Sequence, residues 1–154
     1  MGDFNRSTKE ISLEQIAPDV MQAVNAYIEK RNLGDILSDV SYCIVSTSEK
    51  IKKGLFSGPG PKLFIQTAIL TNRWLILADQ ADKNPILVRT MQLREITIED
   101  YEKSSFYAML PDTGLHVEGI FGPEKGTFFL PLGKDAAGDA FKEAIIRLVQ
   151  EAKK

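Results

Sequence analysis

The alternation of apolar and polar residues between Leu63 and Tyr101 is the feature that most limits how this chain can fold. Side chains along a β-strand point to opposite faces in turn, so this period predicts a series of strands. Asn72 and Arg73 fit a two-residue turn between the first two strands, because Asn tolerates a positive φ. A longer loop is the alternative. The two-residue turn pairs apolar residues along the hairpin: Leu70 with Leu75, Ile69 with Ile76 and Ala68 with Leu77.

Further segments bring the prediction to roughly seven strands in an antiparallel arrangement. Tyr42–Lys53 is rich in Ile, Val and Thr, and the prolines and glycines that follow it predict a loop to the next strand. Phe106–Leu110 is apolar but short. The later strands are expected at Ile86–Met91, Ile96–Tyr101, Leu115–Phe121 and Thr127–Leu132.

Helices are predicted near both ends of the chain. Ser12 with Gln15 fits a capping box before an amphipathic helix, and Leu33-Gly34 ends that helix. The C-terminal segment 136–154 has apolar residues at three- and four-residue spacing, with Asp135 as its N-cap. We expect Phe141 and Leu148 to be core residues of this second helix.

Composition indicates one soluble domain. A chain of 154 residues with 44% hydrophobic content can bury a core, and we expect a flexible N-terminus (1–11), a helical extension (12–41) and an α+β domain (42–154). The net charge of −2 gives no broad positive field, so no nucleic-acid partner is predicted. No apolar run is long enough for a transmembrane segment. Cys43, the single cysteine, fits a reducing, cytoplasmic location and is expected to be buried and inert.

The residues that could carry catalysis form no complete motif. Asp112-Thr113-Gly114 matches the aspartic-protease tripeptide, but one copy cannot supply the paired carboxylates, and a turn is the simpler interpretation. His116 shares a strand face with Glu118, yet this pair lacks a nucleophile. One His and one Cys cannot make a zinc site. We therefore predict a protein that is not an enzyme and has no cofactor or metal.

The hairpin tip Thr71–Leu75, the stretch Met91–Ile96, the late hairpin and the C-terminal helix together resemble bacterial pleckstrin-homology-like (PH-like) domains. The resemblance runs from about Tyr42 to Ala152. It implies a roughly seven-stranded antiparallel barrel capped by an α-helix, and it implies a binding module, because most relatives of that fold bind other molecules. We expect protein–protein interaction or self-assembly, with the N-terminal helix packed on the barrel or on a partner.

Five residues are candidates for binding. Many eukaryotic members of the PH-like fold hold phosphoinositide headgroups through basic residues near the loop between their first two strands. Lys50, Lys52, Lys53 and Lys62 occupy a comparable stretch here, so weak binding of anionic lipid or a membrane surface is the alternative function. Solvated lysines that discourage aggregation at a sheet edge are the simpler interpretation. Trp74 is expected to be a core or rim anchor, and an exposed Trp74 would be the best contact for a partner.

Overall fold

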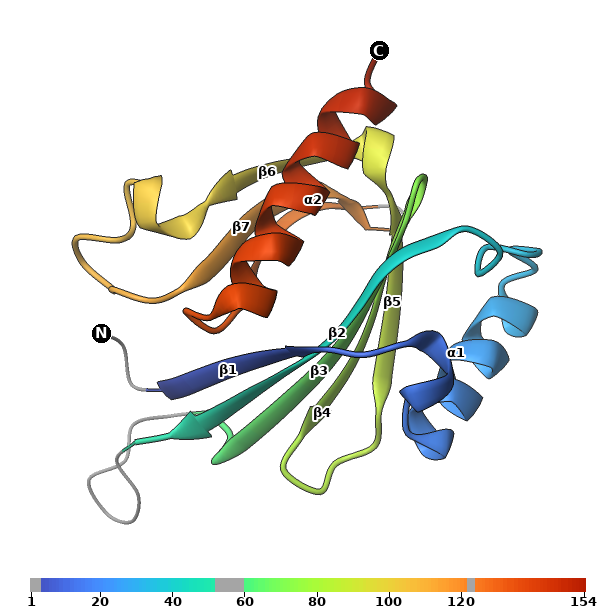
Figure 1. Cartoon of the computed structure of the whole chain (residues 1–154), viewed down its shortest axis with the longest axis horizontal. Coiled ribbons are helices and arrows are strands. Elements are labelled where there is room, and N and C mark those ends of the chain that lie inside the picture. Colours follow the sequence, from blue (N-terminus) through green and yellow to red (C-terminus); the bar gives the residue numbers. More distant parts are fainter. Residues whose placement is uncertain (1–3, 52–59, 122–123) are drawn as a thin grey trace.

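A computed structural model of the chain describes residues 4–51, 60–121 and 124–154. In this part of the chain eight β-strands pair only with antiparallel neighbours, and two α-helices are present (Figure 1). The elements are β1 (Phe4–Glu10), η1 (Leu13–Gln15), α1 (Pro18–Lys30), β2 (Val40–Lys50), β3 (Leu63–Thr71), β4 (Trp74–Ala81), β5 (Leu87–Gln92), η3 (Leu93–Glu95), β6 (Ile96–Asp100), η4 (Tyr101–Lys103), β7 (Gly114–Phe121), β8 (Glu124–Pro131) and α2 (Ala136–Ala152).

The strands form two sheets, not the closed barrel that was expected. The first sheet has the order β1-β2-β3-β4-β5, and the second has the order β6-β7-β8. The 3-10 turn η3 makes the corner between them. Within the described residues no strand pairing joins the two sheets, and β1 forms the edge of the first sheet next to β2. The prediction of a mainly β fold with a closing helix is confirmed, and that of a closed barrel is corrected to two sheets.

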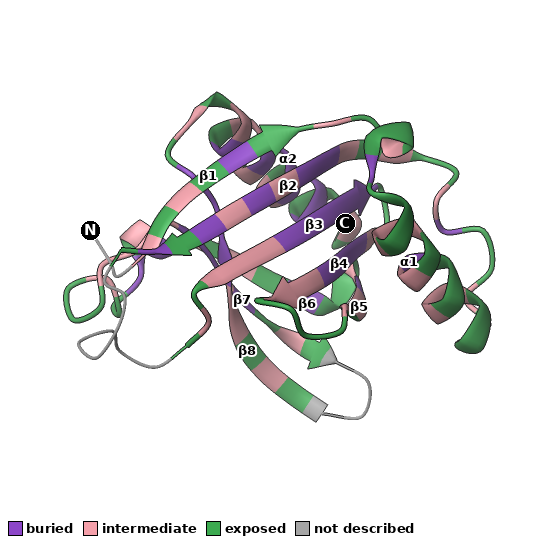
Figure 2. Ribbon diagram, turned by 90° about the horizontal axis from the view of Figure 1, so that it is seen from below, coloured by how far each residue is buried: buried purple, intermediate pink, exposed green. Residues whose placement is uncertain are grey.

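The main core lies between the two sheets and α2. Phe141 and Leu148 of α2 are buried, as predicted, and they pack with apolar residues from both sheets. Asp135 caps the helix, because its Oδ1 accepts the N–H of Gly138 at 2.8 Å. Figure 2 shows buried residues running along the middle strands. Fully buried members of this core include Ile44, Leu70, Leu75, Leu77, Leu93, Ile96, Leu115 and Leu130.

A smaller core lies on the opposite face of the first sheet, under α1. Cys43 belongs to it while its neighbour Ile44 belongs to the main core, as the alternation of side chains along β2 requires. Val24 of α1 is fully buried there against Ile69 and Ile76. The N-terminal helix therefore packs on the sheet of its own chain. Of the two positions expected for it, on the β domain or on a partner, the structure shows the first.

The β3–β4 hairpin has the predicted register, but its turn is made differently. Leu70 pairs with Leu75 and Ile69 with Ile76. Asn72 is not among the residues with positive φ in the described chain, so the expected left-handed turn residue is absent. The Thr71 hydroxyl instead accepts the N–H groups of Arg73 and Trp74, at 3.1 and 2.8 Å. The side chain of Thr71 thus stabilises the turn without a left-handed residue.

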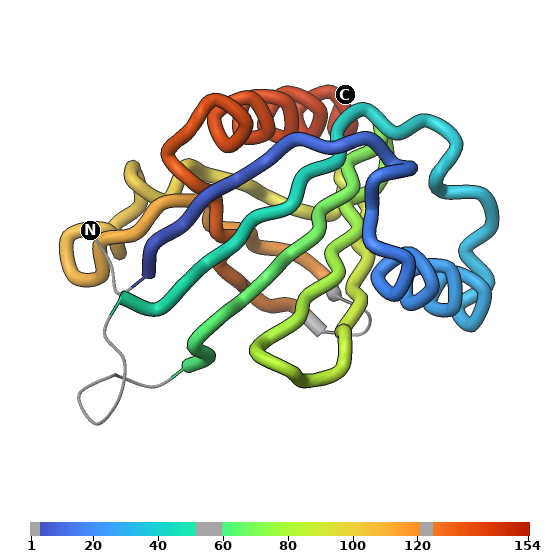
Figure 3. The backbone as a smooth tube through the Cα atoms, turned by 60° about the horizontal axis from the view of Figure 1, so that its bottom comes forward, coloured from blue at the N-terminus to red at the C-terminus, as the bar shows by residue number. Residues whose placement is uncertain are grey.

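The N-terminus is a strand and not the flexible segment that was expected. Residues 4–10 pair with β2 along the edge of the first sheet (Figure 3). Thr8 fixes this strand to the start of α2: its N–H donates to Asp135 Oδ2 at 2.8 Å, and its hydroxyl accepts the N–H of Gly133 at 2.8 Å. The segment is polar and short, so the pattern of its sequence did not reveal a strand; pairing with β2 supplies its stability.

Candidate interaction surface

Three large apolar side chains are exposed on the segment between η4 and β7. The exposed fractions are 52% for Phe106, 83% for Met109 and 71% for Leu110. We call residues 104–110 the apolar loop. It projects from the end of the molecule where β1 begins (Figure 1). A cluster of exposed apolar side chains on one segment is the usual mark of a contact surface.

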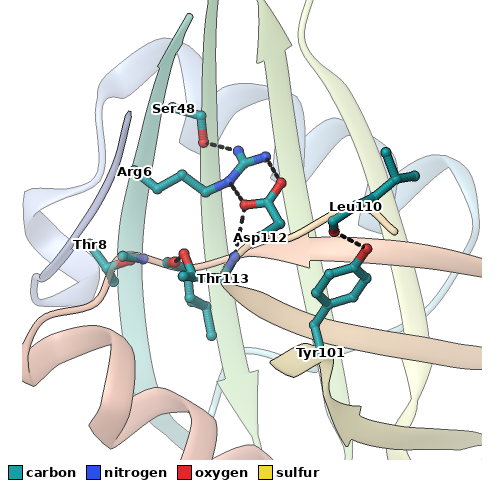
Figure 4. Close-up of polar contacts among 9 residues, drawn as sticks. Arg6, Thr8, Ser48, Tyr101, Leu110, Asp112 and Thr113 are labelled. Atoms are coloured by element: carbon teal, nitrogen blue, oxygen red, sulfur yellow. Dashed lines mark hydrogen bonds and ion pairs between the residues drawn. The ribbon is translucent and has the colours of Figure 1, made fainter. Parts of the chain in front are cut away.

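Tyr101 braces the base of the apolar loop. Its hydroxyl donates to the carbonyl of Leu110 at 2.7 Å (Figure 4). Ser104 Oγ donates to the carbonyl of Tyr101 at 2.7 Å. The ring of Tyr101 packs edge-on against Phe129 and Tyr107, with centroid distances of 4.9 and 6.4 Å. Both ends of the loop are therefore tied to one buried residue, Tyr101, the first end through its backbone carbonyl and the second through its hydroxyl.

An ion pair fixes the residues that follow the loop. Arg6 donates to both carboxylate oxygens of Asp112, from Nε at 2.6 Å and from Nη2 at 2.7 Å, and its Nη1 donates to Ser48 Oγ at 2.6 Å (Figure 4). The guanidinium also lies 4.7 Å from the ring centre of Phe4 and 5.2 Å from that of Phe129. Only 9% of the Arg6 side chain and 22% of the Asp112 side chain are exposed. Paired in this way, Arg6 connects β1 and β2 to the loop.

The electrostatics of this cluster keep Tyr101 as a hydrogen-bond donor. Burial raises the pKa of the Tyr101 hydroxyl, and the negative charge of Asp112 adds to that effect. A neutral hydroxyl keeps its bond to the Leu110 carbonyl, and the Asp112 carboxylate is engaged by Arg6. The arrangement holds a loop in place and contains no nucleophile paired with a base.

His116 supports the same loop from β7. Its Nδ1 lies 3.3 Å from Glu99 Oε1 on β6, and its ring packs edge-on against Phe106 with a centroid distance of 5.4 Å. Strand register sets this partner, because Glu99 is directly opposite His116, whereas Glu118 is opposite Thr97. The prediction that His116 pairs with Glu118 is therefore wrong, since cross-strand neighbours are closer than residues two apart on one strand.

Of the predicted lysine group, the structure describes Lys50 and Lys62, and it places only Lys62 on the surface. Lys50 is buried, with 3% exposed, and its Nζ donates to the carbonyl of Gly60 at 3.4 Å. Lys62 is exposed, and its backbone N–H donates to Asp82 Oδ1 at 3.0 Å. Lys52 and Lys53 lie outside the described residues. The expectation of an exposed position is wrong for Lys50, because its pairing with Phe4 on β1 places it in the interior of the sheet. The binding of anionic lipid stays a prediction.

Trp74 and Cys43 lie away from the apolar loop. Trp74 is half-buried at the β3–β4 turn, where it packs against the small core under α1 and also lines a cleft. It is thus both an anchor and partly accessible.

Cys43 is buried in the same small core, and burial raises the pKa of its thiol to about 11. The expectation of a buried Cys43 is confirmed, and the raised pKa keeps it a neutral thiol.

Sequence reasoning missed Arg6, Asp112 and the apolar loop. Arg6 was placed in a flexible terminus, and Asp112 was interpreted only as a turn residue. One signal was available for the loop: Phe106–Leu110 is apolar without strand alternation and runs directly into Pro111. An apolar segment that fits neither a strand nor a helix is a candidate for an exposed contact.

Comparisons of the chain with family models, with curated proteins and with solved structures give no match. Across residues 4–51, 60–121 and 124–154, no helix combines the length and the apolar character needed to cross a bilayer.

Proposed function

We propose that this chain is a non-catalytic interaction module that docks on a protein surface through the apolar loop, and that a second copy of the chain is the partner its geometry favours. The observation that carries the proposal is the exposure of Phe106, Met109 and Leu110 on a loop held at both ends. Exposed apolar side chains cost free energy in water, and contact with another apolar surface recovers it.

A PH-like fold is part of the proposal. Four strands, β2 to β5, precede three strands, β6 to β8, and then one closing helix, α2, and this order supports the resemblance noted in the sequence. β1, η1 and α1 are additions to that plan. Folds of this kind host many functions, so the argument for binding rests on the loop and not on the fold.

The fixed position of the loop favours specific docking. A segment that is already ordered loses little conformational entropy when it binds, so more of the contact energy appears as affinity. Charges of both signs surround the loop: Lys134 lies 3.3 Å from Glu102, and Lys103 is exposed. Apolar contacts ringed by mixed charges are typical of protein interfaces.

A hollow beside the apolar loop favours a second copy as the partner. Its volume is about 320 Å³, and Phe4, Tyr107 and Lys134 are among the residues that line it. In a two-fold symmetric dimer the same surface occurs on both subunits, so a projecting loop on one subunit can be received by a recess on the other. The apolar loop and this hollow provide the two halves of such a surface.

The test is the concentration dependence of the molecular mass by sedimentation velocity. We expect the native chain to form a dimer as concentration rises, and the double variant Met109→Ser/Leu110→Ser to weaken dimerisation at least tenfold, because it removes the core of the contact. Leu87→Ser is the matched control, since Leu87 is 69% exposed on β5 outside the loop. It should leave the dimer unchanged. A monomer at every concentration, or equal weakening by Leu87→Ser, would refute self-association through this loop.

The anionic-lipid alternative is tested with vesicles that contain phosphatidylserine. Lys62 is the exposed, described member of the predicted lysine group, to which Lys52 and Lys53 also belong. Lipid binding through these lysines should fall as salt rises and should be lost in Lys52→Gln/Lys53→Gln/Lys62→Gln. Dimerisation should survive both changes, because its core is apolar. Vesicle binding that is lost in the lysine variant, without a dimer, would favour the lipid function over the one proposed here.

A further inference from the structure

A second hollow lies at the other end of the molecule. It has a volume of about 880 Å³ and lies between the α1–β2 connection, the β3–β4 turn, η3 and the last turn of α2. Figure 1 shows the β3–β4 turn, η3 and the C-terminal end of α2 close together at this end. Its volume falls in the range of small-molecule sites, which is about 300 to 1,000 Å³. We call it the Trp74 cleft.

Two arginines form one wall of the Trp74 cleft. Arg73 is at the tip of the β3–β4 hairpin and Arg94 is in η3, and the Leu93 N–H donates to the Arg73 carbonyl at 2.8 Å. This bond holds the two segments side by side. Both arginines are exposed, and neither side chain makes a hydrogen bond or ion pair with the described part of the chain. Their guanidinium groups are therefore free to bind an anion.

Two aspartates line the same cleft from the α1–β2 connection. Asp35 and Asp39 follow Gly34, whose φ of 78° starts the connection after α1. Both are exposed, and none of the ion pairs found among the described residues joins them to Arg73 or Arg94. The cleft thus carries positive and negative groups on different segments that do not neutralise each other by direct contact.

The charges elsewhere on the first sheet are arranged differently. Arg6 is paired with Asp112, and Arg89 Nη2 lies 2.8 Å from Asp79 Oδ2. These arginines also stack on aromatic rings, Arg89 on Phe128 at 4.5 Å. In both of these cases the arginine has a carboxylate partner. Arg73 and Arg94 have no such partner among the described residues, and both line a cleft, where charged groups can orient a ligand.

Trp74 gives the cleft an aromatic surface. One part of its side chain packs on the small core under α1, so the ring is held in place, and another part lines the cleft. A fixed indole ring offers a flat apolar contact at low entropic cost. Trp74 is also the single tryptophan of the chain, so tryptophan fluorescence reports on the surroundings of this one residue, which include the cleft.

We propose that the Trp74 cleft binds a small zwitterionic molecule. Arg73 and Arg94 hold its carboxylate or phosphate group, because guanidinium groups match these anions with paired hydrogen bonds. Asp35 and Asp39 receive its ammonium group, and Trp74 contacts its apolar part. The site lies at the opposite end from the apolar loop and does not depend on the proposed dimer.

Titration of Trp74 fluorescence tests this site with four probes. Phosphoethanolamine and glycyl-phenylalanine carry both charges and differ in the anion, whereas inorganic phosphate and ethanolamine carry one charge each. We expect a saturable change with at least one zwitterion, with a midpoint at or below about 1 mM, and weaker binding of both single-charge probes. Which zwitterion binds distinguishes a phosphate ligand from a carboxylate ligand.

Variants assign the binding to the four charged residues. Arg73→Gln and Arg94→Gln should each weaken binding about tenfold or more, since a hydrogen bond to a charged group is lost. Asp35→Asn/Asp39→Asn should weaken binding of the zwitterion but not of phosphate. Arg147→Gln, an exposed arginine on α2 outside the cleft lining, is the control and should bind normally.

Three results would overturn the inference. The first is the absence of saturation with either zwitterion up to about 10 mM. The second is equal weakening by Arg147→Gln, which would show a general charge effect. The third is binding of phosphate alone as tightly as the zwitterion, which would leave an anion site without a role for the aspartates.

Discussion

The two ends of this molecule use charge and apolar surface in opposite ways. At the apolar-loop end Arg6 and Asp112 are mostly buried and paired with each other, while Met109 and Leu110 face water. At the Trp74 cleft the ions are exposed and unpaired, as in Arg73 and Arg94, while the apolar ring is partly covered. The groups that each end leaves without a contact, apolar side chains at one and charged side chains at the other, indicate the kind of partner it would bind. The first end needs an apolar surface, and the second needs a charged small molecule.

The main core connects the two ends, because α2 runs from Asp135 beside β1 to Ala152 at the Trp74 cleft. We expect Phe141→Ala to have the largest effect, a loss of about 3 to 5 kcal/mol in the free energy of unfolding, since it leaves a cavity under the helix. Urea unfolding measures it. Glu143→Ala on the exposed face of α2 is the control. An unchanged urea midpoint for Phe141→Ala would mean that α2 is not packed into the main core that connects the two ends.

The next largest loss of stability is expected at the apolar-loop end alone, from breaking the ion pair between Arg6 and Asp112. Asp112→Ala should cost about 3 kcal/mol, because it leaves the guanidinium of Arg6 mostly buried without its carboxylate. Urea unfolding of Asp112→Ala and of Arg6→Met/Asp112→Leu measures the effect. The double variant should recover part of the loss, since an apolar pair needs no counter-ion. A loss as small as that of a surface substitution would show that the ion pair does not brace the loop.

Alkaline pH should lower the free energy of unfolding through two different groups, the Cys43 thiol under α1 and the Tyr101 hydroxyl at the base of the apolar loop. Burial raises the pKa of Cys43 from 9.0 to about 11, so the unfolded chain ionises first and folding stability falls as pH rises. The contribution of the neutral thiol is complete below pH 9.0 and is lost as pH rises through about 11. It amounts to about 3 kcal/mol. Cys43→Ala should therefore flatten the fall of the unfolding free energy in this range.

Tyr101 provides the matching control at the loop end. Its pKa is raised by burial and then by Asp112, so its ionisation also lowers stability at high pH. That contribution persists in Cys43→Ala and is removed in Tyr101→Phe. Identical pH curves for the native chain and Cys43→Ala would contradict a buried neutral thiol.

A smaller effect is expected at the hairpin beside the Trp74 cleft. Thr71→Val should cost about 1 kcal/mol, because the N–H groups of Arg73 and Trp74 lose the hydroxyl that accepts them. Thermal unfolding measures the change. Thr71→Ser keeps the hydroxyl and should retain most of the stability. A Thr71→Val protein as stable as the native chain would show that the turn holds without this side chain.

The smallest effects are expected where the proposed binding occurs. Met109→Ser and Arg94→Gln should each change the free energy of unfolding by less than about 0.5 kcal/mol, since both side chains are exposed and make no hydrogen bond within the described chain. Thermal unfolding of dilute protein measures both. A loss above about 1 kcal/mol in either variant would show a structural role and would weaken the corresponding binding proposal.

Local sequence patterns predicted much of the fold because they report on single elements. The β3–β4 register follows from matching apolar residues on either side of Asn72 and Arg73, and the strand pairing in the structure agrees with it. The α2 helix follows from apolar spacing and the Asp135 cap. The two sheets and the strand β1 were not predicted, because pairing with a distant edge leaves little trace in a polar segment such as residues 4–10.

The candidate sites were less predictable than the fold. Trp74 was chosen from the sequence, and the structure places it at a cleft, but Arg73 and Arg94 were not chosen with it. Lys50 was chosen for its charge and is buried. Charge alone does not distinguish a solvated lysine from a buried one, since strand pairing decides which side chains reach water.

The sequence by itself determined the β-rich class, the hairpin register and the closing helix, because apolar periodicity and capping act over a few residues. Only the tertiary structure brought Arg6 to Asp112, 106 residues away along the chain, and Arg73 beside Arg94. These contacts depend on how two sheets and two helices pack. A local pattern sets which face of an element is apolar, whereas the packing of all elements decides which charges are paired and which remain free to bind.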